Sequence, residues 1–209
     1  MEHILQILYE VGVEAGRDNS EPDGKTKYAV FQTKPNTNVK YNGAKAIIDL
    51  YNPAVKQNQI SMAQIWIEAG PPAELNGIQF GWADPNTGNW WLVVENRISI
   101  GYWPKELFTH LNDGASFVQY GGWTYNSPDG LSPPMGSGRF ASGNLKQSCF
   151  FAQIELMNTN NNLVDATEDI LQRFVDSDKC YSAKFWGYQG SVLGQSFSFG
   201  GPGGQCNAA

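Results

Sequence analysis

The chain of 209 residues lacks the features that mark membrane proteins and nucleic-acid-binding proteins. No apolar run approaches the ~20 residues that a helix needs to cross a bilayer. Basic residues such as Lys25 and Lys27 stand isolated rather than in a cluster, and the net charge is -6. Binding to nucleic acid by counterion release requires concentrated positive charge. We therefore expect a protein that contacts neither membrane nor nucleic acid.

Histidine and cysteine are also scarce, which limits metal and disulfide chemistry. The only histidines are His3 and His110, and the three cysteines form no C-x-x-C motif. A zinc site would need an unusual set of carboxylates, so we expect no metal and no cofactor. Three cysteines leave one unpaired in any disulfide scheme. The sequence has no glycosylation sequon, so no local motif indicates passage through a secretory pathway.

The N-terminal segment does not resemble a signal peptide. Residues 1–10 have no basic stretch and no small-residue cleavage site. Ile4, Leu5, Leu8 and Tyr9 fall on one helical face, so we predict a short amphipathic helix and linker over residues 1–26. We predict that residues 27–209 form one β domain.

From Lys27 onward, short runs rich in Val, Ile and aromatic residues alternate with Gly, Pro, Asn and Asp. Ala44, Ala46, Ile48 and Leu50 alternate onto one face, as expected of a half-buried antiparallel strand. The pattern predicts an all-β fold, an antiparallel sandwich or barrel. The predicted strands span 27–33, 44–51, 60–68, 78–82, 89–94, 98–102, 117–125, 149–157 and 196–199.

Two short helices are predicted to interrupt the strands. The first spans 104–111, because proline is tolerated in the first turn of a helix. The second spans 167–174, with Thr167 as its N-cap. The inward-facing residues are expected to be Leu107, Phe108 and Leu111 in the first helix, and Ile170, Leu171 and Phe174 in the second.

Seven short phrases occur in an order typical of one family. They are GAKA at 43–46, QIWI at 64–67, LNGI at 75–78, DPNTGNWWL at 84–92, GYWP at 101–104, MGSG at 135–138 and GGPG at 200–203. Together they resemble the plant neprosin-domain family of glutamic, proline-cutting endopeptidases. The resemblance covers the chain from about Lys27 to Cys206, and it implies an antiparallel β-sandwich.

The resemblance also implies a catalytic pair of glutamates that face each other across a groove. One would activate water and the other would protonate the leaving nitrogen. Gln79 occupies the first place, in the phrase at 76–82, and Trp123 occupies the second, after Gly121-Gly122. An amide cannot take a proton from water near neutral pH, and an indole does neither acid nor base work. We therefore predict an inactive family member, with Gln79, Trp123 and Trp82 as groove residues.

A long stretch of the family is absent between Trp82 and Asp84, where this chain has only Ala83. We therefore predict an internal deletion near residues 82–84 and a sandwich that lacks several strands. Such a sandwich would have an exposed edge, which is a hazard for self-association. The oligomeric state stays open.

The family closes a C-terminal loop with a disulfide, and Cys180-Tyr181 and Cys206 match that layout. The resemblance implies a Cys180–Cys206 bridge and an extracellular location. Cys149, left free, is interpreted as a small buried hydrophobic residue, because no basic partner is near it in sequence.

Three functional readings stay open. The first is a residual acid peptidase with re-sited carboxylates. The second is a noncatalytic module that binds peptide or cell-wall polymer, and the third is a truncated product without a function of its own. The nearest carboxylates are Glu68 and Glu95, which we interpret as solvated strand ends. The aromatic residues considered for binding are Trp90, Trp91, Trp103 and Trp123, of which the first three are interpreted as core residues.

Overall fold

The computed structural model describes residues 25–206 except 37, 80 and 95–97, and it leaves the side chains of 81 and 82 undescribed. The predicted N-terminal helix therefore lies outside the described residues. Within the described part, no helix is long and apolar enough to span a membrane.

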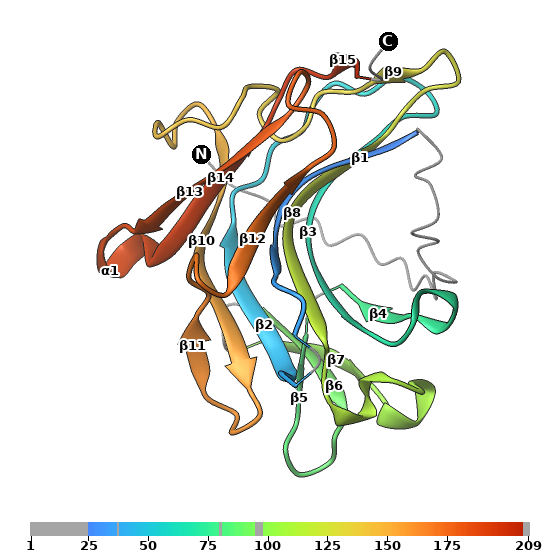
Figure 1. Ribbon diagram of the computed structural model, residues 1–209, viewed down its shortest axis with the longest axis vertical. Coiled ribbons are helices and arrows are strands. Elements are labelled where there is room, and N and C mark those ends of the chain that lie inside the picture. Colours follow the sequence, from blue (N-terminus) through green and yellow to red (C-terminus); the bar gives the residue numbers. More distant parts are fainter. Residues whose placement is uncertain (1–24, 37, 80, 95–97, 207–209) are drawn as a thin grey trace.

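Two antiparallel sheets make up most of the structure (Figure 1). The five-stranded sheet has the order β12 (Leu171–Val175), β1 (Thr26–Thr33), β8 (Phe117–Tyr125), β3 (Ile60–Ala69) and β4 (Asn76–Ile78). The eight-stranded sheet has the order β13 (Ser182–Tyr188), β14 (Gln195–Gly200), β10 (Cys149–Asn158), β2 (Tyr41–Ile48), β5 (Gly81–Ala83), β6 (Trp90–Val94) and β7 (Ile98–Trp103), with β11 (Leu163–Asp165) beside β10. A small third sheet pairs β9 (Leu131–Ser132) with β15 (Gly204–Gln205).

The hydrophobic core lies between the two large sheets. Phe31 of β1 contacts Phe197 of β14 with ring centroids 5.0 Å apart, and Phe197 stacks on Phe151 of β10 at the same separation. Tyr120 of β8 donates a hydrogen bond of 2.8 Å to the backbone oxygen of Glu155 on β10. Aromatic rings and one buried hydroxyl thus join the sheets, and the all-β sandwich predicted from the sequence is confirmed.

One predicted strand, 78–82, is wrong because it is two strands in different sheets. Ile78 ends β4, which pairs with Ile67 of β3 in the five-stranded sheet. Gly81 begins β5, which pairs with Ala44 of β2 in the eight-stranded sheet. A local run of apolar residues does not reveal such a change of sheet, because chains that switch sheets do so through bends inside an extended segment.

Both predicted helices are also wrong. Residues 104–111 contain a 3₁₀ turn at Lys105–Leu107, and another turn, Leu111–Asp113, begins where the predicted helix should end. Leu111 is buried as expected, but Leu107 is 65% exposed. Residues 167–174 form a single turn, closed by Leu171 N–H donating to Thr167 O at 2.9 Å, and then become β12. The strands β9, β11, β12, β13 and β15 and the short helix α1 (Gly190–Leu193) were not predicted.

A regular hairpin spans the place where the resemblance led us to predict an internal deletion. Trp82 of β5 pairs with Trp91 of β6, and the turn between them is closed by Asp84 N–H donating to Asn89 O at 2.8 Å. The Asp84 carboxylate accepts a hydrogen bond of 2.7 Å from the Thr87 hydroxyl, which holds the pKa of Asp84 below its usual value. The chain therefore continues through residues 82–84 without an irregular break.

Candidate functional site

Trp123, where the resemblance implies the second glutamate, lies on the face of the five-stranded sheet that points away from the core. On β8, Tyr120 points into the core, where it contacts Phe151. Side chains alternate along a strand, so Gln119, Gly121 and Trp123 point to the opposite face. We call this the outer face.

Trp123 lies on this outer face near the end of β8, the middle strand of the five-stranded sheet. Its neighbours across the sheet are Tyr28 on β1 and Met62 on β3. The ring is half-buried, and its Nε1 is shielded from solvent without a hydrogen-bond partner in the described structure. A buried donor without a partner is costly. A ligand would reach this N–H only by displacing the groups that shield it.

The two glycines before Trp123 are required by close packing. A Cβ on Gly121 would lie 2.5 Å from the Ala29 backbone oxygen, and the residue has a φ of +146°. A Cβ on Gly122 would lie 2.5 Å from Cε2 of Phe199 in the core. The Gly-Gly pair thus lets β8 approach β1 on one side and the core on the other.

Gln79, where the resemblance implies the first glutamate, does not lie beside Trp123. It is an exposed residue just after the end of β4 at Ile78, which pairs with Ile67. Trp123 pairs with Met62, five residues earlier on β3. In this register residue 79 lies opposite Trp66, and Trp123 lies opposite Met62. The two positions are therefore separated by four residues, or ~13 Å, measured along β3. Trp82 lies in the other sheet, in β5, so the structure does not bring the three predicted groove residues together.

Two polar residues on the outer face, Gln64 and Gln119, were missed from the sequence, whereas Glu68 was considered there. Gln64, Glu68 and Gln119 are buried there, and Trp66 lies between the first two on β3. Trp66 also makes an edge contact with Tyr28, with centroids 6.2 Å apart. The available signal for Gln64 was the spacing of residues 64, 66 and 68. Every second residue of a strand lies on the same face, so this spacing places Gln64 beside Trp66 and Glu68.

Glu68 is 7% exposed, so its interpretation as a solvated strand end was wrong. It lies opposite Gly77 of β4, and a Cβ on that glycine would meet Cγ of Glu68 at 3.5 Å. Glu95, the other carboxylate considered, lies outside the described residues.

The remaining tryptophans divide between core and surface. Trp90 is fully buried and donates its Nε1–H to the Leu111 oxygen at 3.3 Å, and Trp103 packs against the core, so both predictions are confirmed. Trp91 is only half-buried and lies against Tyr102, with centroids 4.9 Å apart. Trp91 is therefore not a core residue.

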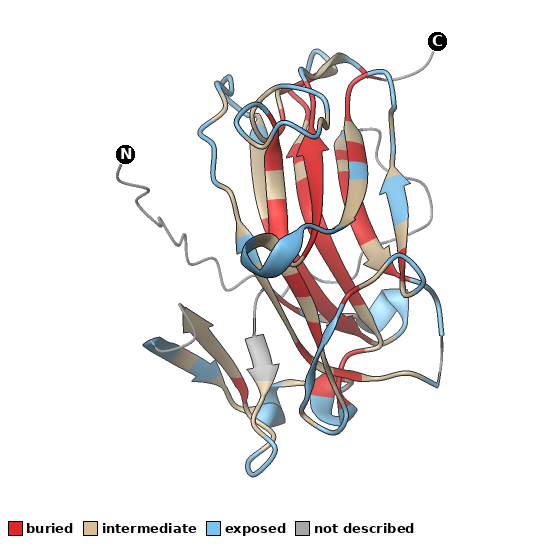
Figure 2. Cartoon of the chain, turned by 90° about the vertical axis from the view of Figure 1, so that its left-hand side faces the viewer, coloured by how far each residue is buried: buried red, intermediate tan, exposed pale blue. Residues whose placement is uncertain are grey.

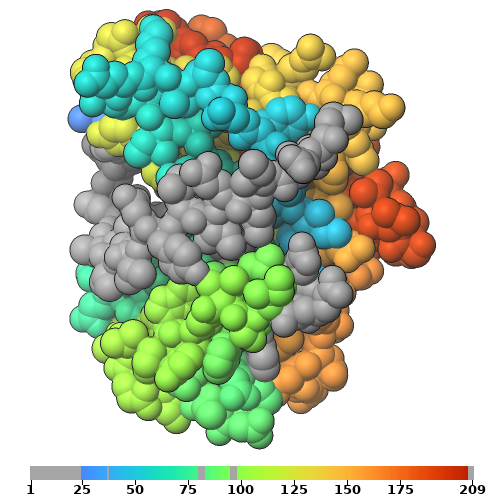
Figure 3. Space-filling view, turned by 180° about the vertical axis from the view of Figure 1, so that it is seen from behind, coloured from blue at the N-terminus to red at the C-terminus, as the bar shows by residue number. Residues whose placement is uncertain are grey.

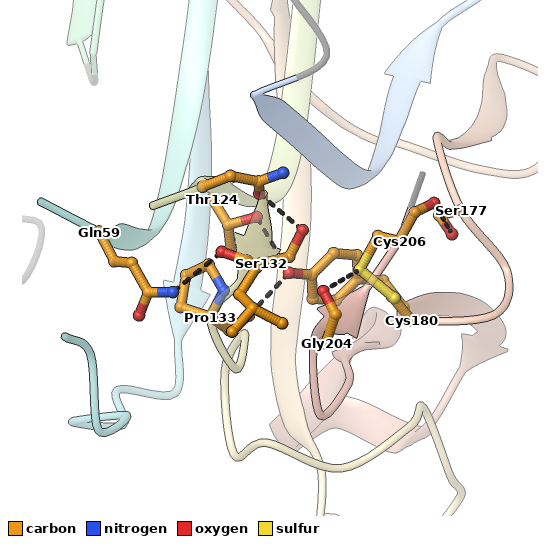
Figure 4. Close-up of a disulfide and its surroundings, with 11 residues drawn as sticks. Gln59, Thr124, Ser132, Pro133, Ser177, Cys180, Gly204 and Cys206 are labelled. Carbon is orange, nitrogen blue, oxygen red and sulfur yellow. Dashed lines mark hydrogen bonds between the residues drawn. A yellow bond between two sulfur atoms is a disulfide. The ribbon is translucent and has the colours of Figure 1, made fainter. Parts of the chain in front are cut away.

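The disulfide Cys180–Cys206 is present, with the two Cα atoms 5.6 Å apart (Figure 4). Ser177 donates to the Cys206 oxygen at 3.1 Å, and Tyr181 donates to the Pro133 oxygen at 2.7 Å. The bridge and these bonds hold the C-terminal loop against the sandwich.

Cys149 is free and buried, and its thiol donates to the Asp49 oxygen at 2.9 Å. Burial raises the pKa of this thiol far above its usual value, so it stays protonated. The expectation of a small buried residue is confirmed.

A comparison with protein families finds a match to the neprosin family over residues 82–202, more than half of the chain. The matched segment contains Trp123 and Cys180 but begins after Gln79. The alignment of Gln79 with a family glutamate therefore depends only on the resemblance of residues 76–82. Trp123, in contrast, lies inside the matched segment. With its β-sandwich and its C-terminal disulfide, the chain belongs to the neprosin family.

Proposed function

We propose that this neprosin-family protein has no glutamate-dependent peptidase activity and binds an extended, proline-containing peptide on the outer face of the five-stranded sheet. The observation that carries the proposal is Trp123, an indole with an unpartnered N–H at the place where the family resemblance puts a glutamate. An indole there can donate a hydrogen bond and offer a ring face, but it cannot exchange a proton.

The loss of activity follows from the chemistry of the two replacements. Removing a single general acid or base typically lowers the rate by 10²- to 10⁴-fold. Here neither Gln79 nor Trp123 can protonate a leaving nitrogen or activate water. Little turnover should therefore remain at any pH.

The choice of a peptide ligand follows from the composition of the outer face. Tyr28 and Trp123 are half-buried neighbours on β1 and β8, so part of each ring is accessible on this face. Proteins commonly use such aromatic rings to bind proline-rich segments.

The test combines a cleavage assay with a binding assay. Purified protein should leave proline-containing peptides intact at pH 3 and pH 7, while an immobilised peptide of that kind should bind it. Trp123→Ala should weaken this binding by roughly tenfold, as loss of a central aromatic anchor does. The control Trp91→Ala removes a half-buried tryptophan of the other sheet and should leave binding unchanged.

Three outcomes would contradict the proposal. Turnover that survives removal of contaminating proteases would show an active enzyme. Binding that is indifferent to Trp123→Ala would place the peptide elsewhere, and binding to cell-wall polysaccharide instead of peptide would identify the other class of ligand.

One observation favours a second candidate, a residual acid peptidase. Glu68 is a buried carboxylate on the outer face, opposite Gly77, which lies two residues before Gln79. If cleavage is found at acid pH, Glu68→Gln should abolish it and Glu74→Gln, at an exposed carboxylate, should not.

We also propose an extracellular location for the protein. Disulfides persist in oxidising compartments and are rare in the cytosol, and the structure contains the bridge Cys180–Cys206. Immunolocalisation of the native protein would test this, and a cytosolic pool with both cysteines reduced would contradict it.

A further inference from the structure

A polar cavity of about 250 Å³ lies beside α1, on the face of the eight-stranded sheet that points away from the core. Ile154 and Leu156 of β10 are buried in the core, so Glu155 between them points outward, into this cavity. Figure 2 shows α1 as an exposed coil at the front of the molecule, and Figure 3 shows it in red beside the orange hairpin of β10 and β11. We call this cavity the α1 pocket, and its lining includes Lys45, Gln153, Glu155, Asp165, Tyr188 and Ser191.

Three charged residues form a row across the α1 pocket. Glu155 lies opposite Lys45 of β2 on one side and opposite Asp165 of β11 on the other. Lys45 forms an ion pair with Glu155, and Asp165 accepts a hydrogen bond of 3.4 Å from Gln195. Two carboxylates directly opposite each other destabilise a sheet. Proteins keep such unfavourable pairs mainly where function requires them.

Gln153 supports the same interpretation through its backbone. It has a φ of +46°, and the register between β10 and β2 shifts between Ala152 and Glu155, which marks a β-bulge. The amide nitrogen of Gln153 donates to the Val192 oxygen of α1 at 2.9 Å, so the amide oxygen is the atom left for a ligand. Bulges and left-handed residues other than glycine are concentrated at ligand sites, where they redirect a side chain.

The polar groups of the α1 pocket select the class of ligand. Lys45 and the hydroxyls of Tyr188 and Ser191 donate hydrogen bonds, whereas the two carboxylates and the Gln153 oxygen accept them. The carboxylates disfavour an anion, the lysine ammonium disfavours a cation, and both disfavour an apolar ligand. These groups fit a neutral ligand with several hydroxyls, because each hydroxyl both donates and accepts.

Tyr188 adds an aromatic surface at the rim of the pocket. It is 61% exposed, and a tyrosine offers an apolar ring together with a polar tip. Such a ring can cover the C–H face of a sugar while the polar groups bind its hydroxyls. The cavity is smaller than the ~300–1,000 Å³ of sites for drug-sized ligands, which suits a ligand of one ring.

We propose that the α1 pocket binds a single neutral sugar unit, either free or as part of a glycan. The site lies on the eight-stranded sheet, whereas Trp123 and the outer face belong to the five-stranded sheet. Sugar binding is therefore a second function, independent of the peptide binding proposed above.

Titration with the methyl glycosides of glucose, galactose, mannose and xylose, followed by heteronuclear NMR, tests the proposal. At least one glycoside should shift the backbone signals of Gln153, Glu155 and Ser191. The dissociation constant should be on the order of 1 mM, as for a ligand of about a dozen non-hydrogen atoms. Because the ligand is uncharged, this constant should change little with ionic strength.

Two variants test the contribution of the pocket. Tyr188→Ala removes the exposed ring, and Asp165→Asn removes a carboxylate while keeping its shape. Each should raise the dissociation constant by about tenfold. Asp165→Asn also relieves the like-charge contact with Glu155, so it should not lower the urea midpoint of unfolding. A role in stability alone would leave sugar binding unchanged.

Matched controls separate this site from the rest of the surface. Tyr102→Ala removes a tyrosine that is 51% exposed on β7, and it should bind the glycoside as the wild type does. Trp123→Ala should also leave glycoside binding unchanged, and Tyr188→Ala should leave peptide binding unchanged. The failure of either proposed function is therefore distinguishable from the failure of the other.

Three results would overturn the proposal. The first is the absence of shifts with all four glycosides up to their solubility limits. The second is binding that is indifferent to both Tyr188→Ala and Asp165→Asn. The third is a stronger response of the same residues to methylammonium chloride than to any glycoside, which would identify a site for cations.

Discussion

Gly122 illustrates how packing dictates residue identity at single positions. It immediately precedes Trp123, and its place beside Phe199 and Met135 leaves no room for a methyl group, since a Cβ would lie 2.5 Å and 2.8 Å from their side-chain atoms. The family's Gly-Gly phrase is therefore explained here by core packing.

Gly122→Ala should destabilise the protein by about 1–3 kcal/mol, because an added methyl in a close-packed core displaces its neighbours. Urea unfolding followed by tryptophan fluorescence measures the change. The control is Gly77→Ala on β4, where the new Cβ would meet only Glu68 at an ordinary 3.5 Å. A similar loss of stability in both variants would mean that replacing a strand glycine by alanine is destabilising whatever the packing around it.

At the scale of elements, strands were easier to predict than their surroundings. The predicted strand 117–125 coincides with β8, because its apolar run is long and bounded by turn residues. The segment 167–174 failed, since Thr167 does start a turn but the following residues gain more from pairing with β1. Pairing with a strand more than a hundred residues away leaves no local signal, and tertiary context overrides helix propensity.

The C-terminal loop is the element for which a disulfide matters most. The bridge joins residues 26 apart. By the chain-entropy estimate, Cys180→Ala with Cys206→Ala should cost ~3 kcal/mol. Chemical denaturation of the oxidised wild type and the double variant measures this, and Cys149→Ala tests whether removal of a buried cysteine outside the bridge has the same effect. Peptide mapping without reduction should find Cys180 linked to Cys206 and Cys149 free.

At the scale of the whole molecule, the resemblance named individual positions but could not give the distances between them. The resemblance pointed to positions 79 and 123, and Trp123 does lie on the outer face of a sheet. It could not show that the chain changes sheet between Ile78 and Gly81, which leaves Gln79 at a crossing point. Gln64 and Gln119 were missed, because a polar residue on the outer face of a strand is expected to be exposed, and its burial depends on tertiary contacts that leave no local signal.

This geometry predicts that restoring both acids will not restore cleavage. A general acid and a general base must both reach one scissile bond, directly or through one water, yet positions 79 and 123 are ~13 Å apart along β3 alone. Gln79→Glu with Trp123→Glu should therefore stay inactive on proline-containing peptides at pH 3, as should Gln79→Glu alone. Cleavage by the double variant, confirmed with an inhibitor-treated preparation, would show that the two positions do come together.

Finally, the contact between the two sheets should make the protein sensitive to alkali. The Tyr120 hydroxyl on β8 donates to the Glu155 oxygen on β10 at 2.8 Å, and burial raises the pKa of Tyr120 well above its ordinary value. Burial also raises the pKa of Tyr41 and Tyr181. The folded state thus holds its protons more tightly than the unfolded chain, whose tyrosines titrate near pH ~10.

Stability from these groups should be complete below about pH 10 and should fall as the pH rises above it, by up to ~1.4 kcal/mol per pH unit for each tyrosine. Urea midpoints between pH 8 and pH 12 measure the slope. Tyr120→Phe should lose about 1 kcal/mol at pH 8 through the missing hydrogen bond but should show a shallower alkaline slope. The exposed control Tyr188→Phe should keep the wild-type slope, and an unchanged slope in Tyr120→Phe would mean that other groups set the alkaline limit.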